Sequence, residues 1–125
     1  LSENLKYYRK QSTQLSSKMR YIAAQFIPYL KEGIWLDNAR KSNSAAQQLF
    51  SLMSELPGVS IARPVQSNAV FFVLPKELRD RLRERYFFYD WDEAAGEARL
   101  VCSWDTSMED IEQFTEHLTA LLSGA

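Results

Sequence analysis

The stretch "PGVSIARPVQSNAVFFVLP", residues 57–75, marks the point at which the chain changes from helical to strand patterning. In residues 59–64, Val, Ile and Arg alternate with Ser, Ala and Pro, which is the period of two typical of a strand. Gln, Ser and Asn at 66–68 supply a turn, and 69–74 is an apolar run of strand length. The stretch therefore predicts an antiparallel pair of strands.

Two long helices are predicted before this stretch. In residues 3–31 and 34–56, apolar side chains recur at steps of three and four, as on one face of a helix. Ser2 is a suitable N-cap for the first helix. Ser and Thr side chains at 12–16 can compete for backbone hydrogen bonds, and Pro28 lacks a backbone N–H. We therefore expect the first helix to break near 12–16 and to bend again at Pro28.

A helix, a hairpin and a last helix are predicted after this stretch. Residues 76–85 have a helical pattern, with their five Lys and Arg side chains expected in water. Residues 86–91 and 98–103 flank a polar turn that contains a glycine, which predicts a β-hairpin. Thr106 is followed three residues later by Glu109, the spacing of a capping box at the start of a helix.

The order of these elements predicts the fold class. Two long N-terminal helices are followed by strand, strand, helix, strand, strand and helix. Such an order indicates an α+β fold, in which helices cover one face of a small, largely antiparallel four-stranded sheet.

Charge and composition exclude several classes of function. The 125 residues carry 15 basic and 16 acidic side chains, so no strong positive field attracts nucleic acid or an anionic membrane. Apolar runs fall far short of the roughly 20 residues that span a bilayer. We expect a soluble, cytoplasmic protein with no nucleic-acid or membrane partner. The first residue is Leu1 rather than Met, and we expect the chain to be a piece of a longer protein.

The chain lacks the usual self-contained catalytic motifs, such as a glycine-rich phosphate loop, GxSxG or HExxH. Cys102 and His117 cannot complete a zinc site, so no metal is expected. The same two residues could form a nucleophile and its base. A buried cysteine and a surface histidine are the favoured interpretation, because free cysteines usually behave as small apolar core residues.

Arg99 is the leading candidate for a functional residue. On a strand, Arg99 shares one face with Val101, while Ala98, Leu100 and Cys102 share the other. A guanidinium can bind a carboxylate through two parallel hydrogen bonds. The alternatives are an arginine at the edge of the strand or a salt bridge to an acid nearby, Glu97 or Asp92.

Three segments resemble the family of pyridoxal-phosphate (PLP) threonine aldolases and β-eliminating lyases. "ARLVCSWDTSMEDIEQF", residues 98–114, is similar to that family's C-terminal signature. "RKQSTQLSSKMRYIAAQ", residues 9–25, resembles the helix that follows the family's Schiff-base lysine segment. Residues 35–75 are similar to the family's run of long helix, "PGV" strand and "NAVF" strand. The three matches occur in the family's order and cover nearly the whole chain.

This resemblance implies the small C-terminal domain of a fold-type-I PLP enzyme, with an aminotransferase-like fold. Residues 1–125 would form this single domain, and 1–33 would connect it to a large domain that carries the Schiff-base lysine. Arg99 matches the family arginine that holds the α-carboxylate of the amino-acid substrate. Arg20, and more weakly Lys10, match positions near the cofactor phosphate, although both also fit solvated charges on an amphipathic helix.

The activity implied is cleavage of a β-hydroxy-α-amino acid such as threonine into glycine and an aldehyde. The fragment alone is expected to be inactive, and the full enzyme is expected to be a homodimer or homotetramer. One alternative within the family is an aromatic amino acid β-eliminating lyase that releases pyruvate. An alternative of another class is a non-catalytic interaction module that binds through the aromatic segment 86–91.

Overall fold

The computed structural model describes residues 3–124, so the predicted N-cap Ser2 lies outside the described residues. The chain divides into two compact units, Leu1–Leu36 and Asp37–Ala125, each of which is described by itself.

The first unit contains three short helices where an interrupted helix was predicted over 3–31. They are α1 (Leu5–Gln11), α2 (Met19–Ala24) and α3 (Phe26–Lys31). None of the three helices buries a residue. Their apolar side chains are therefore exposed within the described part of the chain.

Backbone chemistry explains both interruptions. Thr13 and Lys18, between α1 and α2, have φ angles of 54° and 55°, in the left-handed region that a right-handed helix cannot contain. The break predicted near 12–16 is thus confirmed. The helical stretch is interrupted again at Gln25, one turn before Pro28, where α2 ends and α3 begins. Pro28 has no N–H to donate to the carbonyl of Ala24, and its ring crowds that carbonyl.

Helix α4 (Ile34–Ser54) is the long helix predicted over 34–56. It begins directly after Gly33, whose φ of +74° suits glycine. Its buried side chains lie three or four residues apart along one face, so that face packs on the sheet. They are Ser42, Ala45, Ala46, Leu49 and Met53.

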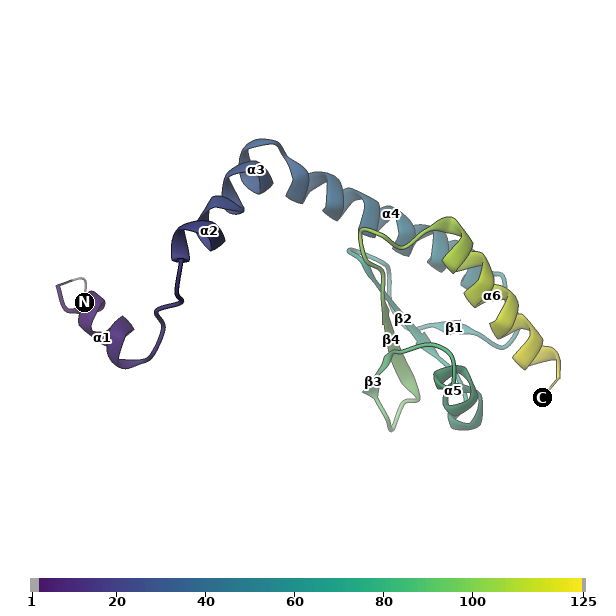
Figure 1. Cartoon of the computed structure of the whole chain (residues 1–125). Helices are drawn as coiled ribbons and strands as arrows, with labels where there is room; N and C mark the ends of the chain where they lie inside the picture. Colours follow the sequence, from purple (N-terminus) through teal and green to yellow (C-terminus); the bar gives the residue numbers. More distant parts are fainter. Residues whose placement is uncertain (1–2, 125) are drawn as a thin grey trace. The chain divides into compact units, whose positions relative to one another are not determined.

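The second unit contains a four-stranded sheet in which every pairing is antiparallel (Figure 1). Its strands are β1 (Ser60–Ile61), β2 (Ala69–Val73), β3 (Tyr89–Asp92) and β4 (Glu97–Val101), in the order β1-β2-β4-β3. The predicted strand pair and the predicted hairpin are both confirmed. Both are shorter than the sequence pattern indicated.

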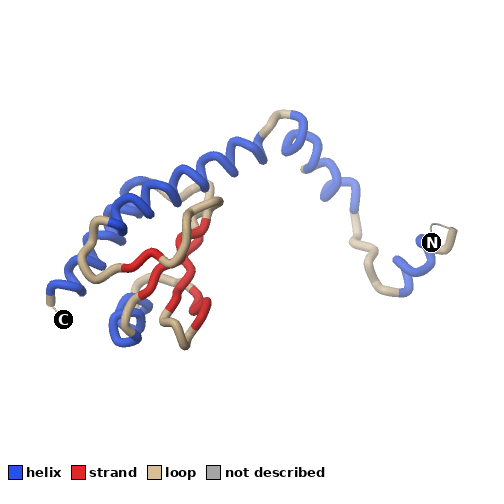
Figure 2. The backbone as a smooth tube through the Cα atoms, turned by 180° about the vertical axis from the view of Figure 1, so that it is seen from behind, coloured by secondary structure: helices blue, strands red, loops and turns tan. Residues whose placement is uncertain are grey.

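Helices cover one face of this sheet, as predicted. α4 and α6 (Met108–Ser123) lie together on one side of the strands in Figures 1 and 2, and α5 (Lys76–Arg83) contacts α6. The core between helices and sheet consists of fully or nearly fully buried apolar side chains. From the strands and the segments that follow them it includes Val70, Phe72, Leu74, Ala98 and Cys102. The alternation of strand residues therefore places Arg99 on the opposite, open face.

The last helix begins one residue later than the predicted capping box. Ser107 is the N-cap, and its hydroxyl accepts a hydrogen bond from the Asp110 backbone N–H at 3.1 Å. The Asp110 carboxylate accepts one from the Ser107 backbone N–H at 2.8 Å. Thr106 does not cap the helix, because its hydroxyl accepts a hydrogen bond from the Ser103 N–H at 2.9 Å.

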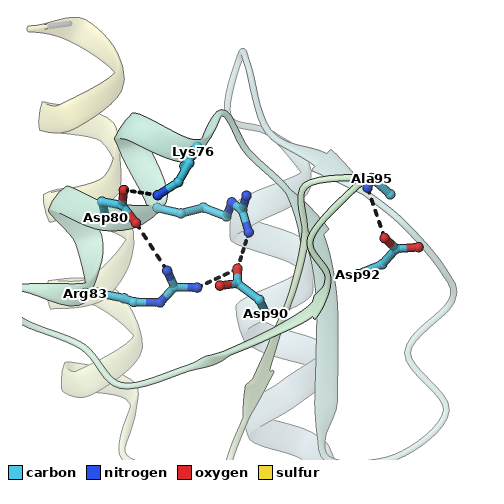
Figure 3. A network of polar contacts seen from close by, with 7 residues as sticks. Lys76, Asp80, Arg83, Asp90, Asp92 and Ala95 are labelled. Atoms are coloured by element: carbon cyan, nitrogen blue, oxygen red, sulfur yellow. Dashed lines mark hydrogen bonds and ion pairs between the residues drawn. The ribbon is translucent and has the colours of Figure 1, made fainter.

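A charged network joins α5 to the hairpin (Figure 3). Arg79 donates to the Asp90 carboxylate, which also lies 2.5 Å from Arg83. Asp80 pairs with Arg83 at 3.3 Å and with Lys76 at 2.7 Å. Arg79 is only 3% exposed, which corrects the prediction that all five cations of this helix face water.

Candidate functional site

Arg99 lies in a row of three side chains across the open face of the sheet. In the strand register, Arg99 on β4 is opposite Phe71 on β2 and opposite Tyr89 on β3. Directly opposite residues of antiparallel strands point to the same face, with side chains in contact range. The guanidinium is thus flanked by aromatic rings from two neighbouring strands.

Aromatic rings pack against the guanidinium of Arg99, and no acid of the described residues pairs with it. Its Cζ lies 5.4 Å from the ring centroid of Trp91 and 6.0 Å from that of Phe71. These two rings pack edge to face at 5.2 Å. Arg99 is half-buried, and its Nε atom is buried without a hydrogen-bond partner. Among residues 3–124, no carboxylate forms an ion pair with Arg99.

The two acids considered as internal partners of Arg99 are engaged elsewhere. Glu97 is 6% exposed, and its Oε2 accepts a hydrogen bond from Arg63 at 2.7 Å. Asp92 accepts a hydrogen bond from the Ala95 backbone N–H at 3.0 Å. The geometry therefore leaves Arg99 as a half-buried cation that pairs with neither of these two acids.

Arg63 is part of this site, although sequence reasoning did not identify it. It lies 34 residues before Glu97, and its Cζ is 4.5 Å from the centroid of the Phe71 ring. The available signal was its place at the end of the alternating segment 59–64, but no local pattern assigns it an acid 34 residues away.

Large exposed apolar side chains lie on β3 and on the segments before it and after β4. The exposed fraction is 80% for Phe87, 59% for Tyr89 and 52% for Trp91. From the loop after β4, Trp104 is 55% exposed. In the aromatic segment 86–91, Phe88 is buried. Aromatic side chains at such exposure are typical of a surface that another protein part covers.

Arg20 and Lys10 belong to the first unit, on α2 and α1. Both are exposed. Arg20 donates to the hydroxyl of Tyr21 at 3.2 Å and lies over the ring of the same residue. Within the described residues neither cation has an acidic partner, so both are available to an anion.

Cys102 and His117 do not form a catalytic pair. Cys102 is 3% exposed, and burial raises the pKa of its thiol. His117 packs against the ring of Tyr86, with ring centroids 5.9 Å apart. No hydrogen bond joins the two residues in the structure of 3–124. A buried cysteine agrees with the favoured interpretation.

The described residues contain neither a cluster suited to a metal ion nor a helix suited to cross a membrane. Between residues 3 and 124, no cluster of three or more His, Cys, Asp or Glu side chains could hold a metal ion. In the same part of the chain, no helix has both the length and the apolar character to cross a membrane.

Comparison with known proteins identifies the relatives of the chain. No family model matches it. It is 35% identical over 123 residues to a low-specificity L-threonine aldolase of a Pseudomonas species, and 35% identical over 122 residues to that of Pseudomonas aeruginosa. These two threonine aldolases are homologues of the chain. The match covers 98% of this chain, which spans only 36% and 35% of the two aldolases.

Solved structures agree with this relationship. A threonine aldolase of Leishmania major is 26% identical with a TM-score of 0.56, over 65% of this chain and 24% of the aldolase. A glycine decarboxylase of the glycine cleavage system is 26% identical with a TM-score of 0.59, over 67% and 21%. A mutant of C-DES, described as having glycine covalently linked to its PLP cofactor, is 18% identical with a TM-score of 0.56, over 64% and 23%, and shows the fold alone. The resemblance to PLP-dependent threonine aldolases and the α+β fold are thereby confirmed.

Proposed function

We propose that this chain is the C-terminal small domain of a PLP-dependent lyase that cleaves β-hydroxy-α-amino acids such as threonine into glycine and an aldehyde. In this proposal Arg99 binds the α-carboxylate of the substrate. Residues 1–33 connect the domain to a large domain of the same chain. The complete enzyme is a cytoplasmic homodimer or homotetramer.

The state of Arg99 is the observation that carries the proposal. A half-buried guanidinium without an acid partner leaves hydrogen-bond donors that a bound anion can accept. The carboxylate of an amino acid has the charge and the planar shape that the guanidinium fork matches. Trp91 and Phe71 restrict the position of the guanidinium, which lowers the entropy lost when the substrate binds.

PLP is the cofactor that the homology implies, and the chain offers cations for its phosphate. Arg20 is exposed and has no acidic partner among the described residues, as phosphate binding requires, and Lys10 offers a second cation on α1. When bound, PLP withdraws electrons from the Cα of an amino acid. The part played by this chain is to bind and orient the substrate.

Arg99 contributes to the reaction through orientation. Two hydrogen bonds to the carboxylate fix its plane and so limit rotation of the substrate about its Cα. The Cα–Cβ bond is then held in one direction, which favours cleavage of that bond over the others at Cα.

The exposed apolar surface of the first unit supports the large domain and the oligomer as partners. Tyr7, Tyr21, Phe26 and Leu30 are each more than half exposed. Such a surface is typical of an interface with another domain or subunit.

Substitution of Arg99 in the complete enzyme tests the proposal. Arg99→Lys keeps the charge but loses the fork, and we expect the KM for threonine to rise by about 10- to 100-fold, as for loss of a hydrogen bond between charged groups. Arg40→Lys is a matched control, because Arg40 forms an exposed ion pair with Asp37 at 3.3 Å on α4. Acetaldehyde and pyruvate are both measured. An unchanged KM contradicts the role of Arg99, and pyruvate as the product contradicts the aldolase reaction.

A further inference from the structure

Two arginines and one buried carboxylate occupy the open face of the sheet. Arg63 and Arg99 both lie over the aromatic rings of this face, with Arg63 4.5 Å and Arg99 6.0 Å from the centroid of Phe71. Glu97 is the buried acid, and it pairs with Arg63. Among the described residues, Arg99 is thus left without an ion pair to this acid.

Glu97 is placed where it could also reach Arg99. The two residues are two positions apart on β4, so their side chains leave the strand on the same face. Their Cβ atoms are then roughly 7 Å apart, since a strand rises about 3.3 Å per residue. Two long side chains can meet across that distance.

The two side chains differ in what already binds them. Arg99 Nε is buried and takes part in no hydrogen bond among the described residues. Both carboxylate oxygens of Glu97 contact the Arg63 guanidinium, Oε1 at 2.5 Å and Oε2 at 2.7 Å. Arg63 therefore holds an acid that could otherwise pair with Arg99.

We propose that Arg63 is a positioning residue that keeps Arg99 available to the carboxylate of the substrate. By binding Glu97 while stacked on Phe71, Arg63 prevents Glu97 from forming an internal ion pair with Arg99. This inference rests on the proposed role of Arg99 as the carboxylate-binding residue. In this inference, Arg63 affects the affinity for the substrate although it does not contact the substrate.

The test uses the complete enzyme with four variants. Arg63→Met keeps an apolar side chain over Phe71 but releases Glu97, and we expect the KM for threonine to rise at least tenfold, with kcat changed less than threefold. Adding Glu97→Gln removes the released charge, so the double variant should return to within threefold of the parental KM. Arg40→Met is the control for loss of an exposed arginine, and Arg99→Met tests the underlying assignment.

The pattern of results separates this inference from the proposed function. If Arg63→Met and the double variant are equally impaired, released Glu97 is not the cause and the inference is wrong. If Arg99→Met raises KM and Arg63→Met does not, the inference fails while the role of Arg99 stands. If Arg99→Met leaves KM unchanged, both fail. A crystal structure of the Arg63→Met enzyme provides a readout besides activity: we expect the Glu97 carboxylate within hydrogen-bond distance of Arg99, and a Glu97 that remains turned away overturns the inference.

Discussion

Asp90 on β3 accepts a hydrogen bond from Arg79 on α5, and Arg79 is 3% exposed. Arg83 lies 2.5 Å from the same carboxylate (Figure 3). The hairpin and α5 are thus connected by one acid that serves two guanidinium groups. A buried cation depends strongly on its acid partner, because removal of that partner leaves a charge away from water.

Asp90→Asn should therefore destabilise the fold by about 2–4 kcal/mol, since it leaves Arg79 buried without a counter-charge. Urea denaturation of the chain, followed by circular dichroism, measures the change. Asp80→Asn is the matched control, because Asp80 is 50% exposed and its cation partners Lys76 and Arg83 are themselves partly in water. Equal losses for the two variants would contradict a special role for the buried pair.

The N-cap of α6 gives a second prediction. Ser107→Ala removes the acceptor for the Asp110 backbone N–H and should reduce the free energy of unfolding by about 1 kcal/mol. Ser123→Ala is the control, because Ser123 donates to the Thr119 carbonyl at the end of the same helix and does not cap its N-terminus. The two variants are compared by thermal unfolding. A loss at Ser123 as large as that at Ser107 would speak against the cap.

The same cap predicts a dependence on pH. Hydrogen bonds from the side chain and the backbone of Ser107 lower the pKa of Asp110 below its usual value of 3.8. Because the folded-state pKa is the lower one, the stabilisation is complete above the unfolded value and is lost as the pH falls through the folded value. The difference in stability between the parent and Asp110→Asn should thus be constant near neutral pH and shrink below about pH 4. A difference that persists to pH 2 would rule out this linkage.

Cys102 should be unreactive in the folded chain. It is 3% exposed, and burial raises its pKa, so little thiolate is present at pH 8. We expect a thiol reagent to label the native chain slowly. The chain unfolded in about 8 M urea should be labelled rapidly. Labelling of the native chain at the unfolded rate would show that the Cys102 side of the sheet is open.

Substitutions at two glycines distinguish the cost of backbone strain from the cost of a steric contact. Gly33 and Gly96 have φ angles of +74° and +68°. A Cβ at Gly33 meets nothing within 4 Å, whereas one at Gly96 lies 3.2 Å from the Leu74 carbonyl oxygen. Gly33→Ala should cost about 1 kcal/mol for the left-handed backbone alone, and Gly96→Ala should cost more. Chemical denaturation compares the two, and a larger loss at Gly33 would contradict the steric account.

Local patterns in the sequence determined the order of helices and strands and the face on which Arg99 lies. Both follow from short-range periodicity, because strand side chains alternate and helical side chains recur every three or four residues. The interruption of the first helix was also local, since it depends on Pro28 and on residues 12–18. The exact N-cap is local too, but the spacing alone did not distinguish Thr106 from Ser107. Hydrogen bonds between residues three positions apart, Ser103 with Thr106 and Asp110 with Ser107, select Ser107.

Only the tertiary structure decided which charges meet. Glu97 stands beside Arg99 in the sequence, yet it pairs with Arg63, 34 residues away, because the folded sheet brings the two together. The helical pattern predicts Arg79 to be one of five solvated cations. In the fold, the approach of β3 buries it against Asp90. An ion pair depends on distances between elements that fold together, and no local periodicity encodes those distances. The strand pattern thus placed Arg99 on its face, and three-dimensional packing left it without an acid.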